Sequence, residues 1–336
     1  GIIRRAASDA GGIVMSRVQH LIVSEDEADQ RLDRWFKAHF PSMTHGQLEK
    51  HLRKGDIRVD KKRSKASDRL EAGQTVRVPP LSDDVLRPVP MEKGRASETP
   101  KLSDQDIAEI RKMILHMDES VIVLNKPAGL PVQGGSGQYR HVDGLLEGLR
   151  FDFPVKPRLA HRLDKDTSGV LVLGRTRQAA KHLAEAFKMR TTRKIYWALL
   201  SGVPKPKEGT ISYNLAKVVT ANGEKVVVDR DGQKAVTDYS VVEMAAQKAC
   251  WVAFKPLTGR THQLRVHAVA LGTPIVGDGK YGGSEAFLDG VISKKMHLHA
   301  REITISHPDG SDLTVTAPLD RHMVESWKLF DFHEND

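Results

Sequence analysis

The sequence is poor in cysteine. Cys250 is the single cysteine among 336 residues, so no disulfide can form within the chain. Proteins without disulfides are typical of reducing compartments, and we therefore expect a cytoplasmic protein. Cys250 stands in an apolar run with Trp251 and Phe254, and we interpret it as a small buried hydrophobic residue.

Long apolar runs are also absent. No run approaches the ~20 residues that a membrane-spanning helix needs, and no continuous hydrophobic signal segment opens the chain. We therefore expect no association with a membrane. The chain opens with Gly1 rather than Met, and we expect residues 1–18 to be a disordered extension to which we assign no function.

The composition is otherwise that of a folded protein with an uneven charge. Hydrophobic residues make up 39% of the chain, and 336 residues allow two or three domains. The formal net charge is +9, and residues 31–80 hold 13 Lys and Arg against 6 Asp and Glu, a net charge of +7. A basic module beside a nearly neutral body suggests a polyanionic partner, although a solvated charged face explains the charge alone equally well.

Residues 19–80 have the pattern of a compact α/β module. The expected elements are helices over residues 26–36 and 45–54 and short strands over residues 57–59 and 75–78, with a basic loop at residues 61–65 between the strands. Thr44 has the position of an N-cap for the second helix, and Gly55 has the position of the residue that ends it.

The module resembles an S4 domain, which is an RNA-binding fold. The resemblance rests on Arg31-Leu32-Asp33 and on Gly55-Asp56-Ile57-Arg58-Val59. Basic side chains on such a domain would contact phosphates and give a salt-dependent affinity with little sequence information. The candidates for these RNA contacts are Arg53, Lys54, Lys61, Lys62 and Arg63.

A linker and a larger domain follow the module. Recurrent proline, serine and charged residues predict a linker over residues 81–104. Ser103 and Asp106 have the spacing of a capping box that begins a short helix ending at Met113. In residues 105–330 strand-like runs outnumber helices, so we expect an α+β domain with a mixed, largely antiparallel sheet. The clearest elements are strands over residues 121–124, 170–173, 195–200, 236–242 and 251–254 and a helix over residues 177–190.

The most informative segment is His161-Arg162-Leu163-Asp164-Lys165-Asp166-Thr167-Ser168-Gly169. It places a short carboxylate, Asp164, between a basic pair and a turn that leads directly into an apolar strand. A carboxylate held on such a turn can face a cleft. Three further motifs are Asn125-Lys126-Pro127-Ala128-Gly129-Leu130-Pro131-Val132, Lys194-Ile195-Tyr196-Trp197-Ala198, and Gly259-Arg260-Thr261-His262-Gln263-Leu264-Arg265-Val266-His267 with its continuation to Asp278.

These four motifs, in this order, resemble those of the RluA-type pseudouridine synthases, whose catalytic loop reads H-R-L-D-x-x-T-S-G. The resemblance covers about residues 121–318. It implies a pseudouridine synthase, an enzyme that isomerises uridine to pseudouridine in RNA. The S4-like module and Gln133-Gly134-Gly135-Ser136-Gly137 are similar to the RluC-like branch, which implies large-subunit ribosomal RNA as the partner.

The chemistry that the resemblance implies needs a carboxylate. The reaction breaks the bond between the uracil nitrogen and the sugar, turns the base, and joins ring carbon five to the sugar. Nothing is oxidised and no group is added, so we expect no cofactor. By resemblance Asp164 is the nucleophilic or acid–base carboxylate, and Arg265 is the guanidinium that keeps it ionised. Tyr196 would stack on the base and is a candidate for removing the proton at carbon five. Whether Asp164 first attacks the ribose or the base stays open.

The target nucleotide must leave its stack before Asp164 can reach it. Arg162 resembles the family residue that fills the resulting gap, and a structural ion pair with Asp166 is the alternative. Although the chain has 15 histidines, they show no usual metal-ligand spacing, so we expect no metal site. His161 and His262 are expected to bind loop or backbone partners around the site. Nothing in the sequence suggests a symmetric interface, and we expect a monomer.

Two other functions remain for comparison. One is an RNA-binding or ribosome-assembly factor with an inactive synthase body, against which the presence of Asp164, Tyr196 and Arg265 argues. The other is a deaminase or another metal-dependent base-modifying enzyme, against which the missing ligand spacing argues.

Overall fold

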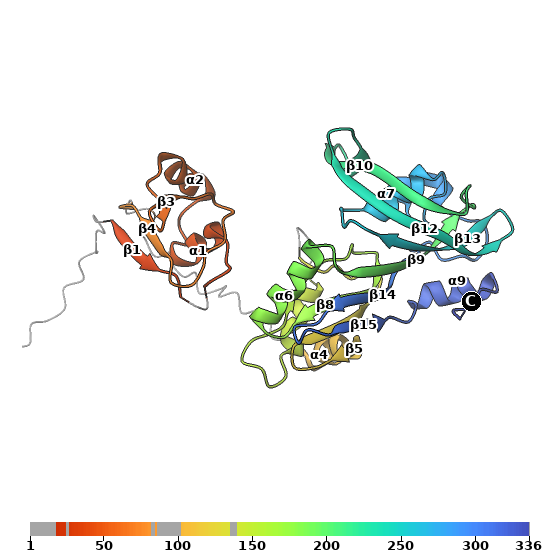
Figure 1. The fold of residues 1–336 in the computed structure, drawn as a ribbon, viewed down its shortest axis with the longest axis horizontal. Helices are drawn as coiled ribbons and strands as arrows, with labels where there is room; N and C mark the ends of the chain where they lie inside the picture. Colours follow the sequence, from red (N-terminus) through yellow and green to blue (C-terminus); the bar gives the residue numbers. More distant parts are fainter. Residues whose placement is uncertain (1–17, 25–26, 82–84, 86–101, 135–139, 336) are drawn as a thin grey trace, which may run out of the picture. The chain divides into compact units, whose positions relative to one another are not determined.

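The computed structural model describes residues 18–24, 27–81, 85, 102–134 and 140–335. The chain divides into two units, residues 1–98 and residues 99–336, and each is described by itself (Figure 1). Almost all of the expected N-terminal extension and most of the expected linker lie outside the described residues, as do residues 135–137 of the glycine-rich segment.

The described part of the first unit contains a small sheet and helices α1 and α2. Its elements are β1 (Gln19–Ile22), α1 (Leu32–His39), α2 (His45–Lys54), β2 (Arg58–Val59), β3 (Lys62–Arg63) and β4 (Thr75–Val78). The described strands pair in the order β1-β4-β2-β3, and all neighbours are antiparallel. Trp35 and Phe36 of α1 and Leu52 of α2 are buried with Val76 of β4 in one apolar cluster. This cluster stabilises the unit because apolar area is removed from water.

The predicted bounds of the second helix, residues 45–54, are confirmed. Thr44 accepts a hydrogen bond from the backbone of Gln47, whose side chain reaches back to the Thr44 backbone, so that a capping box begins α2. Gly55 ends the helix with a φ of 75°, a left-handed conformation that glycine adopts without steric cost.

Two expectations for this unit were wrong in part. Helix α1 begins at Leu32 rather than at residue 26, because Asp29 turns the chain with a φ of 62° and the Leu32 amide then donates to the Asp68 carbonyl. The basic loop contains a short strand, since Lys62 and Arg63 pair with β2. The turn between the two strands has positive φ at Asp60 and Lys61, as a tight hairpin requires.

The second unit is built on one large sheet. Its elements in chain order are α4 (Asp104–Lys112), β5 (Ile114–Met117), β6 (Val121–Lys126), α5 (Val142–Leu145), η1 (Leu146–Leu149), β7 (Arg158–Leu159), β8 (Ser168–Gly174), α6 (Arg177–Lys188), β9 (Arg193–Ser201), β10 (Glu208–Thr220), β11 (Gly223–Val228), β12 (Gln233–Ala245), β13 (Ala249–Pro256), α7 (Gln263–Ala270), α8 (Gly279–Gly282), η2 (Gly283–Ala286), β14 (Leu298–Ser306), β15 (Asp312–Thr316) and α9 (Arg321–Leu329).

The strand order of this sheet is β11-β10-β12-β13-β9-β14-β8-β6-β5, with β15 on β14 and β7 on β8. Among the described strands β8 and β14 are parallel, and every other pair is antiparallel. The mixed, largely antiparallel α+β fold predicted for this part of the chain is therefore confirmed. All the strands that the sequence predicted are present, and the expected helix 177–190 is α6.

Apolar clusters lie along the whole sheet. Strand β8 is buried along its full length between β6 and β14, and Leu183 of α6 packs into the same cluster. Farther along the sheet, Leu264 of α7 lies in a second cluster with Phe254 of β13. Figure 1 shows α7 against the long curved strands β10 and β12. The loop before β8 and the segment before α7 carry the motifs of the candidate site.

No helix in the described part of the chain is long and apolar enough to span a membrane.

Candidate active site

The Asp164 loop is held by the strand that follows it. The Thr167 amide donates to the Asp164 carbonyl at 3.1 Å, which closes a turn directly before β8. Ser168 begins β8 and is hydrogen-bonded through its hydroxyl to Nδ1 of His299 on β14 at 2.8 Å. Gly169 has a φ of 110°, and a side chain there would meet the Ala300 backbone at 2.2 Å. The Thr-Ser-Gly part of the motif therefore allows the backbones of β8 and β14 to approach each other closely.

A buried lysine joins this loop to the first motif. Lys126 has no solvent exposure, and its Nζ donates at 2.9 Å to each of the carbonyls of Pro127, Leu130 and Lys165. Burial lowers the pKa of Lys126 to about 8 against the opposing charges of Asp166, Asp320 and Asp164. The three hydrogen bonds satisfy the ammonium donors and fix the backbone directly after Asp164.

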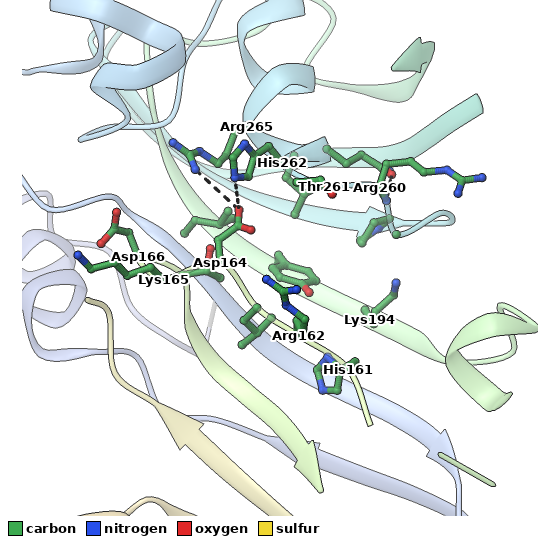
Figure 2. Close-up of a pocket in the computed structure, with 18 of the residues that line it drawn as sticks. His161, Arg162, Asp164, Lys165, Asp166, Lys194, Arg260, Thr261, His262 and Arg265 are labelled. Atoms are coloured by element: carbon green, nitrogen blue, oxygen red, sulfur yellow. Dashed lines mark hydrogen bonds and ion pairs between the residues drawn. The ribbon is translucent and has the colours of Figure 1, made fainter. Parts of the chain in front are cut away.

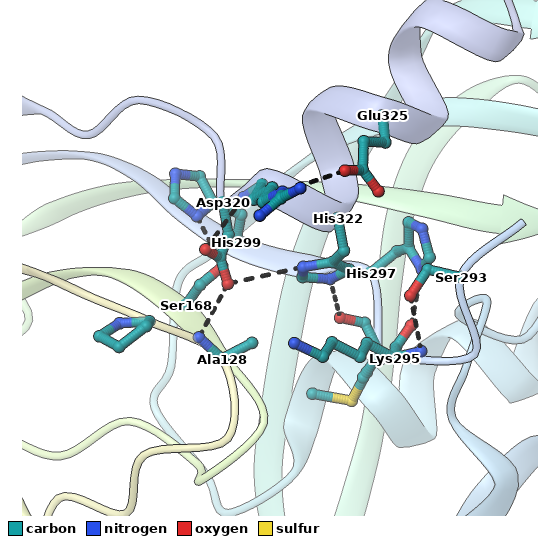
Figure 3. A network of polar contacts seen from close by, with 12 residues as sticks. Ala128, Ser168, Ser293, Lys295, His297, His299, Asp320, His322 and Glu325 are labelled. Carbon is teal, nitrogen blue, oxygen red and sulfur yellow. Dashed lines mark hydrogen bonds and ion pairs between the residues drawn. The ribbon is translucent and has the colours of Figure 1, made fainter.

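A polar network supports the same loops from the C-terminal side (Figure 3). Asp320 at the start of α9 accepts a hydrogen bond from the Ala128 amide at 2.9 Å and lies 3.5 Å from His322. Burial alone would raise the pKa of Asp320, but these contacts outweigh it and lower that pKa far below its ordinary value. His299 bridges Ser168 and the Ala317 carbonyl. The residues behind the loop therefore leave its backbone little freedom.

Asp164 lines a cavity of about 940 Å³ in the second unit. The cavity walls carry more cations than carboxylates. The lining cations are Arg162, Lys165, Arg190, Lys194, Lys217, Arg260, Arg265 and Lys280, and the lining carboxylates are Asp164, Asp166 and Asp278. Such a concave basic surface favours a polyanionic ligand.

Arg265 extends from α7 toward two carboxylates. Its Nε and one terminal nitrogen donate to Asp278 at 3.0 Å and 2.7 Å, and its other terminal nitrogen lies 3.8 Å from Asp164 Oδ2 (Figure 2). Burial would lower the pKa of Arg265, but the hydrogen bonds and charge of Asp278 outweigh it and raise that pKa. The sequence predicted the pairing of Arg265 with Asp164. The bidentate partner, however, is the buried Asp278, which orients the guanidinium.

His262 is the second group that faces Asp164. Its Nε2 lies 3.7 Å from Asp164 Oδ2, and its Nδ1 is hydrogen-bonded to the Tyr281 hydroxyl at 2.6 Å. That hydroxyl also accepts from the Val226 amide of β11 at 3.1 Å, and the Tyr281 ring lies under Arg265 at 4.9 Å. Burial is the largest cause that lowers the pKa of His262, so the imidazole is neutral at neutral pH. The partner of His262 is therefore the hydroxyl of Tyr281 on α8, and the expectation of a loop or backbone partner was wrong for this histidine.

Tyr196 of β9 also lines the cavity. Its neighbours across the sheet are Phe254 of β13 and Ala300 of β14, and these pairings fix its strand. Burial first, and the negative charge of Asp164 second, raise the pKa of Tyr196 well above its ordinary value. The phenol is therefore protonated in the site as it stands.

The surroundings of Arg162 distinguish its two expected roles, which are filling the gap in the RNA stack and forming a structural ion pair with Asp166. Arg162 is exposed on the cavity wall and makes no ion pair with Asp166 or with any other acid in the described ranges. The structural ion pair is therefore the wrong alternative. His161, one residue earlier, accepts a hydrogen bond from the Val172 amide at 2.9 Å and stacks on Phe187, a backbone partner of the expected kind.

The five basic residues expected to bind RNA belong to the first unit. Arg53 and Lys54 end α2, and Lys61, Lys62 and Arg63 lie in the β2–β3 hairpin. All five side chains are exposed, and within the described part of the chain none has an acidic partner within 4.0 Å. Gly55 brings the two groups close, since its Cβ position would lie 3.4 Å from the Arg63 guanidinium.

Four residues of the site were not singled out from the sequence. They are Lys126, Lys194, Asp278 and Tyr281. Each belongs to a motif segment or follows one closely, and that position was the available signal. Among the residues that the structure describes, no group of three or more His, Cys, Asp or Glu is placed to hold a metal ion.

Comparisons with known proteins place the chain in a family. Residues 120–270 match the family described as RNA pseudouridylate synthase. The chain is 35% identical over 321 residues to "Ribosomal large subunit pseudouridine synthase C" of Vibrio cholerae, which covers 93% of this chain and 97% of the relative. It is 35% identical over 311 residues to the protein of the same name from Escherichia coli K12, which covers 90% and 93%.

A solved structure gives the same result. "Human RNA Pseudouridylate Synthase Domain Containing 4" aligns with a TM-score of 0.57 at 29% identity, and the alignment covers 68% of this chain and 97% of that one. The chain therefore belongs to the RNA pseudouridylate synthase family, and it is an enzyme that isomerises uridine to pseudouridine in RNA. The resemblance to the RluA-type enzymes is confirmed.

Proposed function

We propose that the protein converts uridines of large-subunit ribosomal RNA to pseudouridine, with Asp164 as its nucleophile. The observation that carries this proposal is the position of Asp164 on the wall of a basic cavity, within 4 Å of both Arg265 and His262. The names of the relatives from Vibrio cholerae and Escherichia coli support the choice of RNA. We further propose that the enzyme acts in the cytoplasm, as a monomer and without a cofactor.

The target uridine enters the cavity as a flipped-out nucleotide. Extrusion costs a few kcal/mol, and least where the RNA is already unpaired. Arg162 is exposed and forms no ion pair with any described residue, and a residue that occupies the gap in the RNA stack needs both properties. The cationic walls attract the RNA backbone and reduce the cost of bringing its charge close to Asp164.

Asp164 acts on the uridine by one of two routes. Its carboxylate attacks or deprotonates the ribose, or it adds to the pyrimidine ring. In either route the bond from N1 to the anomeric carbon breaks, the base turns, and a bond from carbon five to the anomeric carbon replaces it. Carbon five then loses its proton and N1 gains one, so atoms and electrons balance without a cofactor. Arg265 and His262 stabilise the carboxylate before the attack and as it leaves.

Tyr196 contributes its ring to this reaction at the start. The raised pKa of its hydroxyl disfavours a phenolate in the resting site, so its first role is to stack on the uracil. One cause of the raised pKa is the charge of Asp164, and that charge disappears when the carboxylate is in a covalent bond or has taken up a proton. Proton removal from carbon five by Tyr196 therefore belongs to a late step, after Asp164 has reacted.

The first unit serves as an S4-type RNA-binding domain in this proposal. Its small antiparallel sheet, helices α1 and α2, and the exposed Lys and Arg side chains at the end of α2 and in the β2–β3 hairpin, which have no acidic partner among the described residues, support that role. Arg53, Lys54, Lys61, Lys62 and Arg63 would contact phosphates and add affinity without reading the base sequence.

Pseudouridine mapping tests the substrate. Unmodified large-subunit and small-subunit ribosomal RNA and a transfer RNA pool are incubated with the purified enzyme, and pseudouridines are mapped chemically. We expect modification of discrete uridines in the large-subunit RNA and none at comparable rates in the other two. Modification confined to small-subunit or transfer RNA would refute the proposed substrate.

A further inference from the structure

A group of cations lies in the cavity without neutralising acids. Arg162, Arg190, Lys194 and Arg260 all line the wall, and in the described ranges none of them forms an ion pair. Figure 2 shows Arg162, Lys194 and Arg260 on the opposite side of Asp164 from Asp166. Two of the three lining carboxylates are engaged elsewhere, since Asp278 is bound by Arg265 and Asp164 faces Arg265 and His262. The third, Asp166, lies on the far side of Asp164 from these cations and forms no ion pair with them among the described residues.

Lys194 and Arg260 are the two partly buried members of this group, and Lys194 is the one without a hydrogen bond from its side chain among the described residues. Its side chain is partly buried, it lies beside the Gly259 backbone, and its Nζ has no hydrogen-bond partner among the described residues. Burial and the nearby charge of Arg190 lower the pKa of Lys194. A partly buried ammonium without a counter-charge is unfavourable, because desolvation is not compensated. An anionic group bound in the cavity would supply the missing partner.

The position of Lys194 suits one particular anion. Lys194 and Tyr196 are two residues apart on β9, so their side chains project from the same face about 7 Å apart. In the bound nucleotide the uracil stacks on Tyr196 and the sugar faces Asp164. The phosphates bonded to that sugar then lie just beyond the sugar. A lysine one pleat along the strand is therefore in reach of the backbone that flanks the target.

We propose that Lys194, with Arg190 beside it, binds a phosphate that flanks the target uridine. The proposal rests on the function proposed above, because it takes RNA in this cavity as given. An ammonium binds phosphate as a point charge and does not read a base. Lys194 therefore holds the flipped-out nucleotide by its backbone, while Tyr196 holds the base and Asp164 carries out the chemistry.

Paired changes in the protein and the RNA test this proposal. The RNA is a large-subunit fragment that carries a mapped target uridine, with a normal backbone or with one neutral methylphosphonate on the 5′ or the 3′ side of that uridine. The proteins are the wild type, Lys194→Met, Lys194→Arg and the control Lys248→Met, which replaces an exposed lysine outside the cavity. Binding is measured over a range of salt concentrations, together with single-turnover rates.

We expect Lys194→Met to weaken binding of normal RNA by about tenfold or more, as loss of a charged hydrogen bond does. The slope of log affinity against log salt falls by about 0.7, the value for one phosphate contact with a single strand. One of the two methylphosphonates weakens wild-type binding to a similar degree but weakens Lys194→Met no further. Lys194→Arg keeps most of the affinity, and Lys248→Met behaves as the wild type.

Two outcomes would overturn the proposal. In the first, each methylphosphonate lowers the RNA affinity of Lys194→Met by the same factor as that of the wild type. In the second, neither methylphosphonate lowers the RNA affinity of the wild type. The second outcome needs no variant, so it decides the matter even where Lys194→Met folds poorly. A wild type that modifies no uridine in the fragment would instead refute the proposed function.

Discussion

His262 contacts Asp164 with one ring nitrogen and Tyr281 with the other. The Tyr281 hydroxyl accepts the Val226 N–H, so its own proton is available for donation to Nδ1 of His262. Nδ1 then acts as the acceptor, and in a neutral imidazole the ring proton is on Nε2, which faces Asp164 at 3.7 Å. Tyr281 thereby selects the tautomer that can donate to the carboxylate.

At the residue scale we predict that Tyr281→Phe slows catalysis more than it weakens binding. Phenylalanine keeps a ring under Arg265 but removes the hydroxyl that fixes His262. Loss of a partner that orients a functional side chain typically lowers activity by about tenfold or more. Single-turnover rates and RNA affinities measure the two effects separately. The control is Tyr213→Phe, which changes an exposed tyrosine of β10, and equal rates for the two variants would contradict the role of Tyr281.

At the element scale the parallel pair β8–β14 fixes where the Asp164 loop begins. His299 is paired with Ser168 and Ala300 with Gly169, and at Gly169 the two backbones approach closely. Because the space beside Gly169 is filled by the Ala300 backbone, the neighbour cannot yield by a change of rotamer. The position of the catalytic loop therefore depends on the absence of one side chain.

We predict that Gly169→Ala lowers the free energy of unfolding by more than about 2 kcal/mol and reduces activity with it. Gly223→Ala is the matched control, because Gly223 also has a positive φ, 97°, but nothing lies within 4 Å of its Cβ position. The control has the conformational strain alone, about 1 kcal/mol. Urea unfolding of both variants measures the difference, and equal destabilisation would contradict the backbone clash.

Elements with local signals could be predicted from the sequence. The capping residues Thr44 and Ser103 begin α2 and α4, and the apolar run of β8 is a buried strand. Helix α7 gave no such signal, because most of its residues are buried and no polar face marks the helical period. The start of α1 was missed since it depends on pairing with residues 68–70, far along the chain.

In the candidate site, too, residues with a local sequence signal could be predicted and contacts between distant segments could not. Asp164, Tyr196 and Arg265 were found through their motifs, and all three line one cavity. The bidentate contact from Asp278 and the contacts of Lys126 could not be predicted, because they join segments that only the folded sheet brings together. Lys194 belongs to one of the four motifs, but only the folded cavity shows that no described acid lies within ion-pair distance of it.

At the scale of the whole molecule, buried histidines make stability depend on pH. Burial lowers the pKa values of His267, His297 and His299 to about 4. In the unfolded chain each of them takes up a proton near pH ~6.5. Between about pH 6.5 and 4 the unfolded state therefore binds more protons than the folded state, so stability falls as the pH falls.

We predict that the free energy of unfolding decreases steadily from pH 7 to pH 5, by up to about 1.4 kcal/mol per pH unit for each proton taken up. Urea unfolding at several pH values measures this slope. His299→Gln should reduce the slope, and His333→Gln is the control substitution at an exposed position. A slope that is the same in all three proteins would show that His299 is not held neutral.

The most direct test of the whole account compares two neighbouring carboxylates of one loop. Asp164 and Asp166 both line the cavity. Of these two carboxylates, Asp164 is the one that Arg265 and His262 face. Purified Asp164→Asn and Asp166→Asn are given a large-subunit RNA fragment, and pseudouridine formation and RNA binding are measured. We predict that Asp164→Asn binds RNA as the wild type does but forms pseudouridine at least about a thousandfold more slowly, while Asp166→Asn remains active. Equal rates of pseudouridine formation for the two variants would contradict the account.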